Sequence, residues 1–413
     1  MEDSPSLDQT LPGGLRVVCE RSERSAGVAL ALRIPAGAKD DPSNKYGLAN
    51  LVKETLFRAT KKKNARKLAD AFDYYGIRHS EYTGTEHTTI QVQCLAEHLD
   101  AALGLLREVL SLPAFPQAEF ETARIQSIQE LKHLDDDPMS KVFVLLKQLY
   151  LGSGWGHSEL GSETTLPEIT RDDVLAFWKA HYIPAGSICA VVGKFDPEAV
   201  QKQLDGLFAN RGEAWPRENA PAAPASNAVQ HENKDSEQTQ IALAFPCVPR
   251  RDEQHEAARL AVGVLGGGMS SRLFTEVREK RALVYSVGAQ ASSMRDAGLI
   301  YAYAGTTAPR AKETLEVIRA ELRRLGQDLT QEELDRARVG VKANLLMDQE
   351  STAARARELL DSVFFEDRVV SLQESIDRLN GVTVKQVCDY WNAHPPEPYA
   401  LATIGNAPLG AVQ

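Results

Sequence analysis

Residues 47–57 read Gly-Leu-Ala-Asn-Leu-Val-Lys-Glu-Thr-Leu-Phe and have the apolar spacing of an amphipathic helix. The apolar positions recur every three or four residues, at Leu48, Leu51, Val52 and Leu56. The polar side chains are those of Asn50, Lys53 and Glu54. Positions 50 and 54 are one helical turn apart, so their side chains project from the same face. The segment therefore predicts a helix that packs on a core and presents three polar groups together.

These three polar positions coincide with the frame of a metal-binding helix. An H-x-x-E-H helix carries two histidines one turn apart and a glutamate base beside the second. Here Asn50, Lys53 and Glu54 hold those positions, so both histidines and the base are replaced. Catalytic zinc needs three protein ligands, an open position for water and a base. Because asparagine is a poor zinc ligand and Lys53 puts a cation at the base position, the sequence predicts no zinc in this chain.

Despite these replacements, residues 47–57 resemble the G-L-A-H-F-L-E-H-x-L-F signature of the pitrilysin-type, inverted-motif zinc peptidases. That family includes insulin-degrading enzyme, mitochondrial processing peptidase and the core proteins of the respiratory bc1 complex. The resemblance implies a third metal ligand, a glutamate far downstream, and this position is Glu130. A further glutamate that the family often carries seven residues earlier is Ala123 here. The degenerate metal-site positions are thus Asn50, Lys53, Glu54 and Glu130.

Two interpretations of these positions stay open. In the first, Asn50, Lys53 and Glu54 are simply the solvated face of a packed helix. In the second, which we favour, Lys53 replaces the charge of the missing ion opposite Glu130. An unpaired charge in that place is costly, so this interpretation predicts an ion pair between Lys53 and Glu130. Glu54 and Glu130 alone would form an oxygen site better suited to a hard cation than to zinc.

A second motif lies in residues 270–287, which are similar to the family's S-R-L-F-x-x-L-R-E-x-x-G-L-A-Y-S-V. The resemblance implies that Arg278 and Tyr285 reach from the carboxyl-terminal domain towards a zinc-bound substrate. A guanidinium can hold a peptide carbonyl or carboxylate, and a phenol can donate to a developing oxyanion. The alternative is that Arg278 pairs with Glu276 or Glu279 while Tyr285 packs in a strand. We favour the functional interpretation because the whole motif matches.

A third feature is the predicted strand at residues 77–83. In the family this edge strand pairs with the substrate backbone as an added strand. In place of the family's Asn-Ala the chain has Ser80-Glu81. The replacement leaves the peptide-binding role of this strand open.

The chain contains an internal repeat. The matching stretches are 169–181 (ITRDDVLAFWKAH) with 382–394 (VTVKQVCDYWNAH), and 120–125 (FETARI) with 334–339 (LDRARV). Trp178 matches Trp391 and His181 matches His394, which predicts structural roles for all four. Two copies of one unit are therefore expected.

The order of the predicted elements indicates the fold class. Pairs of strands followed by several consecutive helices favour antiparallel sheets covered by helices, an α+β fold. Residues 212–235 are rich in Pro, Ala and Asn without an apolar period, which predicts an extended linker. The predicted domains are therefore 1–211 and 236–413, and the glycine-rich residues 151–157 predict a loop. The family's fold, two such domains joined by a linker around a cleft, is what the resemblance implies for essentially the whole chain.

Composition excludes several function classes. The net charge is −10 and only Lys61-Lys62-Lys63 forms a basic run, which argues against a nucleic-acid-binding protein and predicts a solvated turn. No apolar run approaches the ~20 residues that span a bilayer. The amino end is acidic and polar, unlike a signal peptide. As written, the sequence predicts a cytoplasmic protein, or a periplasmic or organellar one if a leader was removed.

No other catalytic constellation is found. The 5 cysteines are widely spaced and lack a C-x-x-C pair, which predicts reduced, buried thiols rather than disulfides or a thiolate zinc site. None of the 9 histidines has another at ligand spacing. Gly266-Gly-Gly268 is not followed by Gly-Lys-Ser/Thr, so it predicts a close backbone approach rather than a P-loop.

Three hypotheses follow. In the first, the chain is a non-catalytic subunit of a heterodimeric zinc metallopeptidase and has no cofactor of its own. A homologous partner holds zinc on an intact motif, and Arg278 and Tyr285 contact the peptide substrate in trans. In the second, the chain is a purely structural or peptide-holding subunit that resembles the respiratory core proteins. The third, least favoured, is an enzyme with a relocated metal site. The Arg/Tyr motif favours the first over the second, because a scaffold has no chemical reason to keep it.

Overall fold

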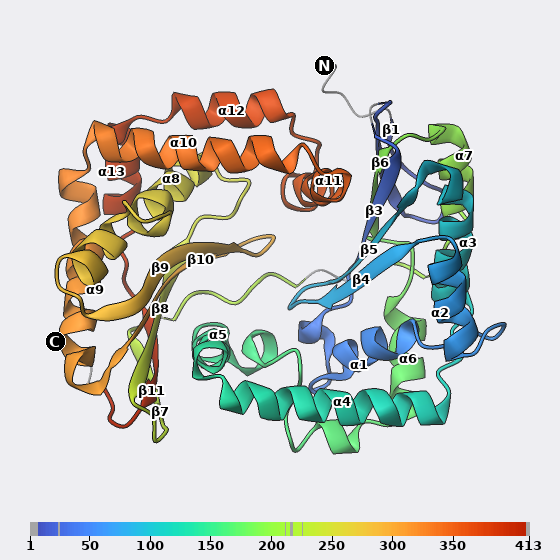
Figure 1. The fold of residues 1–413 in the computed structure, drawn as a ribbon, viewed down its shortest axis with the longest axis horizontal. Helices are drawn as coiled ribbons and strands as arrows, with labels where there is room; N and C mark the ends of the chain where they lie inside the picture. Colours follow the sequence, from blue (N-terminus) through green and yellow to red (C-terminus); the bar gives the residue numbers. More distant parts are fainter. Residues whose placement is uncertain (1–6, 24, 211, 215–217, 225, 410–413) are drawn as a thin grey trace. The chain divides into compact units, whose positions relative to one another are not determined.

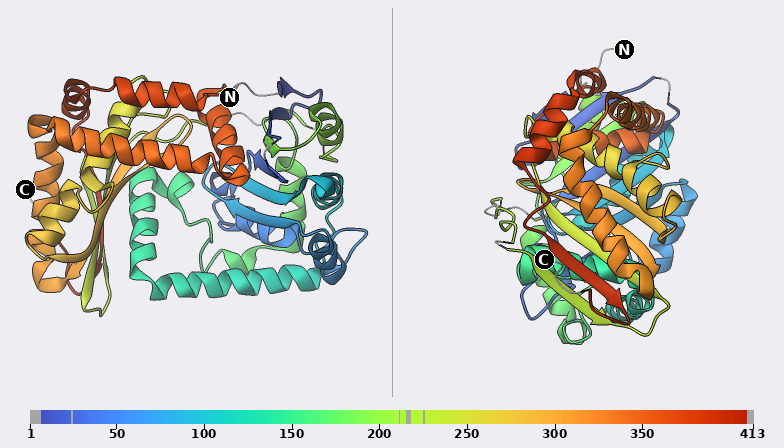
Figure 2. Two further views of the ribbon diagram at one scale, coloured as in Figure 1. Left: turned by 45° about the horizontal axis from the view of Figure 1, so that its top comes forward. Right: turned by 90° about the vertical axis from the view of Figure 1, so that its left-hand side faces the viewer.

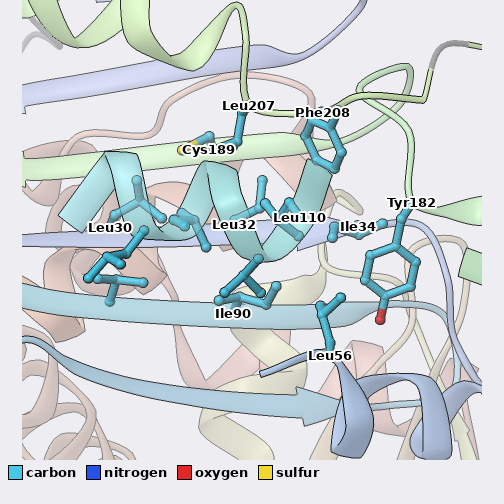
Figure 3. Close-up of a cluster of buried hydrophobic side chains, with 14 of the residues drawn as sticks. Leu30, Leu32, Ile34, Leu56, Ile90, Leu110, Tyr182, Cys189, Leu207 and Phe208 are labelled. Atoms are coloured by element: carbon cyan, nitrogen blue, oxygen red, sulfur yellow. The ribbon is translucent and has the colours of Figure 1, made fainter. Parts of the chain in front are cut away.

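Strand β3 (Gly27–Ile34) shows how a nearly continuous apolar run forms a strand that is buried on both faces. Its larger side chains lie in one hydrophobic cluster: Val28, Leu30, Leu32 and Ile34. Ala29 and Ala31 lie in a different cluster on the other face, as the alternation of side chains along a strand requires. Figure 3 shows Leu30, Leu32 and Ile34 beside Ile90 of the neighbouring strand. Large residues thus fill one layer, and the alanine face admits a closely packed helix.

The computed structural model describes residues 7–23, 25–210, 212–214, 218–224 and 226–409. These residues form two compact units. Unit 1 takes its described residues from 1–133, 157–218 and 347–371, and unit 2 from 134–156, 219–346 and 372–413. Residues 1–6 of the acidic amino end, which the sequence distinguishes from a signal peptide, lie outside the described residues.

Each unit is built on one sheet, and the two sheets repeat one topology (Figure 1). The sheet of unit 1 has the strand order β1-β2-β6-β3-β5-β4 and that of unit 2 the order β7-β11-β8-β10-β9. Apart from β1, the orders correspond strand for strand. In each sheet one pair is parallel, β2 with β6 and β7 with β11, and the other pairs are antiparallel. The α+β fold and the predicted repeat are confirmed.

The strands of unit 1 are β1 (Leu7–Thr10), β2 (Arg16–Arg21), β3, β4 (Arg78–Thr83), β5 (Thr88–Leu95) and β6 (Ile188–Gly193). Those of unit 2 are β7 (Ala228–Asn233), β8 (Gln238–Cys247), β9 (Val284–Ser293), β10 (Gly298–Thr307) and β11 (Ala400–Gly405). The helices of unit 1 are α1 (Leu48–Leu56), α2 (Ala65–Tyr74), α3 (Leu99–Ser111), most of α4 (Gln117–Asp136), α6 (Arg171–His181), α7 (Pro197–Leu204) and α11 (Thr352–Glu366). Unit 2 contains α5 (Pro138–Gly156), α8 (His255–Gly266), α9 (Ala311–Asp328), most of α10 (Gln331–Asp348), α12 (Leu372–Gly381) and α13 (Val384–Ala393).

The alanine face of each sheet is covered by a helix from the other half of the sequence. Helix α11 packs on β3 and β6 in unit 1, where Leu359, Leu360 and Val363 share a cluster with the strand alanines. Helix α5 packs on β8 and β11 in unit 2 in the same way. Figure 2 shows α11 in orange and α5 in green from two further sides. The spatial units therefore differ from the sequence division into 1–211 and 236–413.

Two local expectations need correction. The predicted linker, 212–235, extends too far, because β7 already lies within it and pairs with β11. Residues 215–217 and 225 of that segment lie outside the described residues. The predicted glycine-rich loop is also wrong, because α5 continues to Gly156 across a break at Gly152, where φ is 75°. Gly152 separates two helical segments, and glycine tolerates the backbone conformation between them.

The repeated Trp-x-x-His stretches have matching structural roles. Trp178 donates through Nε1 to the carbonyl of Leu110 at 3.3 Å, and Trp391 donates likewise to Leu322 at 2.6 Å. Each indole is buried, so its N–H needs such an acceptor. Both helices also begin with a capping box, at Thr170 and Thr383.

Candidate functional site

Helix α1 begins at a backbone position that requires glycine. Gly47 has a φ of 98°, and a Cβ there would lie 2.9 Å from the carbonyl oxygen of Leu160. The buried carboxylate of Asp41 accepts hydrogen bonds from the N–H groups of Gly47, at 2.7 Å, and Ala49, at 2.8 Å. Burial raises the pKa of Asp41, against the lowering effect of its hydrogen bonds and of His157. Asp41, which the sequence analysis missed, thus fixes the start of the motif helix.

The three motif positions of α1 do not form a metal site. Asn50 is buried, and its Nδ2 has no hydrogen-bond partner among the described residues. Lys53 donates from Nζ to the Glu54 carboxylate next to it on the helix. Glu54 stands at the position of the motif's second histidine, and its carboxylate is already paired with the Lys53 ammonium group.

The predicted ion pair between Lys53 and Glu130 is wrong. Glu130 is exposed on α4 and has no hydrogen bond or ion pair with any residue that the structure describes. Lys53 instead takes Glu54, which is adjacent in sequence and needs no second helix to bring it near. Helices α1 and α4 are joined further along by Arg58, which donates to Gln126.

This donor set does not fit catalytic zinc. It offers an amide, a cation and two carboxylates, one of them already paired, where three deprotonated ligands and a base are needed. The described part of the chain holds no group of three or more His, Cys, Asp or Glu side chains that could bind a metal ion. The site can therefore pack and orient a helix but lacks the ligand set of a catalytic zinc ion.

The purified chain is accordingly expected to contain no stoichiometric zinc. The measurement is elemental analysis of chain purified without chelator, with Asn50→His, Lys53→Glu, Glu54→His as the matched variant. The variant restores both imidazoles and the base of the H-x-x-E-H motif and keeps Glu130, so it is expected to take up zinc. One tightly held zinc per wild-type chain, whose removal by a chelator abolishes peptidase activity, would contradict the assignment.

The second motif is anchored by a buried arginine. Arg272 donates to Asp328 at 2.6 Å and to both carboxylate oxygens of Glu333, at 2.7 and 2.8 Å. Its bidentate fork ties the start of the motif to the end of α9 and the first turn of α10. The following residues form a π-helical segment, η4 (Phe274–Glu279), instead of a regular α-helix. Such segments are rare and occur frequently at functional sites.

The structure brings Arg278 and Tyr285 together. The Arg278 guanidinium carbon lies 5.4 Å from the centroid of the Tyr285 ring and 4.8 Å from that of Phe274. Both distances are in the cation–π range. Tyr285 lies near the start of β9, an edge strand, and is 81% exposed. The guanidinium thus contacts two aromatic rings, with its donor groups available beside an exposed phenol.

The alternative partners of Arg278 are not used. The Glu276 carboxylate accepts from Lys280 at 2.6 Å and from Arg281 at 2.8 Å. Within the described residues neither the Arg278 guanidinium nor the Tyr285 hydroxyl has a hydrogen bond or ion pair. The alternative pairing of Arg278 with Glu276 or Glu279 is therefore absent among the described residues, and the arginine retains its capacity for an external acceptor.

Strand β4 is an edge strand of unit 1, as expected. It pairs with β5 alone, and the Glu81 carboxylate is bonded to His79 Nδ1 at 2.7 Å. Whether this edge binds peptide stays a prediction. Among the described residues no helix is both long and apolar enough to cross a bilayer.

Fold and motif together define a peptidase-like chain that retains the scaffold of an inverted zinc motif without its ligands. Comparison with known proteins agrees. Residues 16–165 match the family profile described as insulinase, peptidase family M16, and residues 168–340 match that of the peptidase M16 inactive domain. The chain belongs to this family. Residues 47–57 resemble the family's pitrilysin-type motif.

Relatives match along nearly the whole chain. An uncharacterized zinc protease of Rickettsia bellii is 27% identical over 96% of this chain and 96% of its own length. The uncharacterized zinc protease YmxG of Bacillus subtilis is 28% identical over 97% and 98%. Among solved structures, a peptidase M16 inactive domain from Pseudomonas fluorescens has a TM-score of 0.88, with 24% identity and 98% of both chains covered. A protease from Helicobacter pylori has a TM-score of 0.87 at 19% identity, covering 97% of this chain and 99% of that one. At these identities the two structures show the fold.

Proposed function

We propose that the chain is a non-catalytic subunit of a heterodimeric zinc peptidase, in which a homologous partner carries the zinc. In this assembly Arg278 and Tyr285 contribute to the substrate site in trans. One observation carries the proposal. Within the described residues, Arg278 has aromatic contacts but no polar partner, and it lies 5.4 Å from the ring of the exposed Tyr285.

The chemistry of the pair suits a peptide substrate. A guanidinium can donate two parallel hydrogen bonds to a carboxylate or one to a peptide carbonyl. A phenol can donate to the oxyanion that develops when a peptide bond is attacked. Contacts with the Phe274 and Tyr285 rings limit the rotamers of Arg278, so little freedom is lost when an acceptor binds. Because α1 lacks the zinc ligands, the zinc-bound water that attacks the peptide would come from the partner and not from this chain.

The experiment purifies a tagged form of the chain together with its native partner and then separates the two. Cleavage of an unstructured fluorogenic peptide is measured with the chain alone, the partner alone and the mixture. We expect no cleavage by the chain and strong activation of the partner on mixing. A partner that is fully active alone would refute the proposal. A stable mixture without activation would support a purely structural subunit instead.

A further inference from the structure

A pocket of about 220 Å³ lies in unit 2 between α8 and α10, which lie side by side in Figure 1. One wall is the last turn of α8 and the glycine turn that follows it, from Gly263 to Ser271. The other wall is a stripe along α10 that includes Glu333, Gly340 and Asn344. The pocket does not involve Arg278 or Tyr285.

Missing side chains create this space. A Cβ added at Gly340 or at Gly268 would meet no atom within 4 Å. Gly266, in contrast, is required for packing, because its Cβ would lie 2.1 Å from the backbone nitrogen of Ala289. The glycine triplet thus allows a close backbone approach on one side, as the sequence predicts, and leaves an open wall on the other.

A hydroxyl that has no hydrogen bond among the described residues lines the pocket. Ser271 is only 6% exposed, and its Oγ has no hydrogen-bond partner among the residues that the structure describes. The hydroxyl can therefore donate a hydrogen bond to a group that enters the pocket. The Asn344 side chain and the N–H groups of Gly268 and Ser270 likewise have no partner within the described part of the chain.

The hydrogen-bonding groups that line the pocket suit an anion. The Glu333 carboxylate is occupied by Arg272 through both oxygens and by Thr330, so it offers no free acceptor. Arg336 lines the pocket and bonds to Glu332 through Nη1 alone, which leaves its other donors available. The free groups are therefore mainly donors: hydroxyl, amide, guanidinium and backbone N–H.

The repeat relates this pocket to the degenerate metal site. The register that matches Phe120 with Leu334 also matches Glu130 of α4 with Asn344 of α10. Helix α8 follows β8 as α1 follows β3. Equivalent positions of the two units thus carry the Glu130 carboxylate in unit 1 and the neutral Asn344 amide in unit 2. Hydrogen-bond donors surround the amide in unit 2.

We propose that this pocket binds an oxyanion, either a carboxylate or a phosphate group. Ser271 Oγ, the Asn344 amide and Arg336 would donate to it, because charge-assisted hydrogen bonds from such groups are the strong ones. The proposal is independent of the proposed function.

The test is isothermal titration calorimetry on the full chain with two probes. One probe is inorganic phosphate, and the other is an acetylated tripeptide with a free carboxyl terminus, compared with its amidated form. Gly340→Leu fills the pocket, and Gly104→Leu is the matched control, because Gly104 is also a helical glycine whose Cβ would meet nothing within 4 Å. Thermal melts check that each variant is folded.

We expect at least one probe to bind the wild type and the Gly104→Leu control equally. Gly340→Leu should weaken that binding by about tenfold or more, and Ser271→Ala by a smaller factor. Phosphate binding alone identifies phosphate as the source, and preference for the free over the amidated peptide identifies a carboxylate. No binding of either probe, or full binding by Gly340→Leu, would overturn the proposal. If Gly340→Leu fails to fold, unchanged binding of the probe by Ser271→Ala would overturn the proposal instead.

Discussion

Tyr285→Phe is expected to leave assembly with the zinc-bearing partner unchanged but to lower peptide turnover by roughly 10²–10³-fold, the usual effect of removing one oxyanion donor. The variant keeps the ring beside Arg278 and removes only the exposed hydroxyl, which has no partner among the described residues. The loss should appear in kcat more than in KM, because the phenol acts on charge that develops in the transition state. The measurement is steady-state cleavage by the reconstituted mixture.

Arg278→Ala is expected to raise KM as well, since a guanidinium also binds the ground-state peptide. Two controls separate these effects from general surface changes. Tyr74→Phe alters a tyrosine that is also 81% exposed, and Arg66→Ala removes an arginine whose side chain is 90% exposed. Both lie in unit 1 and should leave turnover unchanged. Full activity of Tyr285→Phe and Arg278→Ala would show that the pair has no role in the reaction.

Arg272→Met is expected to lower the free energy of unfolding by about 3 kcal/mol, the low end of the cost of breaking a buried ion pair. The Arg272 side chain is 5% exposed, whereas those of Glu333 and Asp328 are 19% and 43% exposed. Methionine fills similar space but leaves two carboxylates without their shared cation. Water reaches these carboxylates in part, so the effect is smaller than for a fully enclosed pair. Urea unfolding followed by circular dichroism measures it.

The ion pair between Arg272 and Glu333 should also make the free energy of unfolding depend on pH in the acid range. Burial raises the pKa of Glu333, but hydrogen bonds from Arg272 and Thr330 outweigh this and lower the pKa to about 2. A lowered folded-state pKa means that the stabilisation is complete above the ordinary value of 4.5 and is lost as the pH falls from there towards 2. In Arg272→Met this part of the pH dependence should flatten.

Arg251→Met is the matched control for Arg272→Met. Arg251 pairs with Asp296 at 2.6 Å in the same unit, but half of its side chain is exposed. Such a pair contributes about 0–1 kcal/mol. Equal destabilisation by the two variants would show that burial of Arg272 is not what matters.

Local patterns predicted much of the fold. Strands β3 and β5 are of the kind that local patterns predict, because an apolar run and an alternating run each fit a strand with a defined number of buried faces. The capping box of Thr170 and Asp173 at the start of α6 is likewise local, since it is a contact between near neighbours. The placement of α5 and α11 was not predicted, because it depends on contacts between residues far apart in sequence.

The sequence predicted the residues of the candidate site but not their full geometry. The motif at 270–287 identified Arg278 and Tyr285, and their proximity follows from the turn between η4 and β9. The π-helical geometry could not be derived from a period of 3.6 residues. The pairing of Lys53 failed because helix geometry gives the direction of a side chain but not the nearest competing carboxylate. Asp41 had one available signal, an acidic residue shortly before the glycine that starts a helix.

The origin of α11 has a consequence for synthesis of the protein. A ribosome releases all strands of the first sheet long before it reaches residues 352–366, because β6 ends at Gly193. Until then the face formed by Val18, Ala29, Ala31 and Ala190 lacks the helix that buries it. The nascent chain therefore carries an open apolar sheet face, a surface prone to aggregation and suited to a chaperone. Translation that stops before residue 352 would leave that surface uncovered permanently.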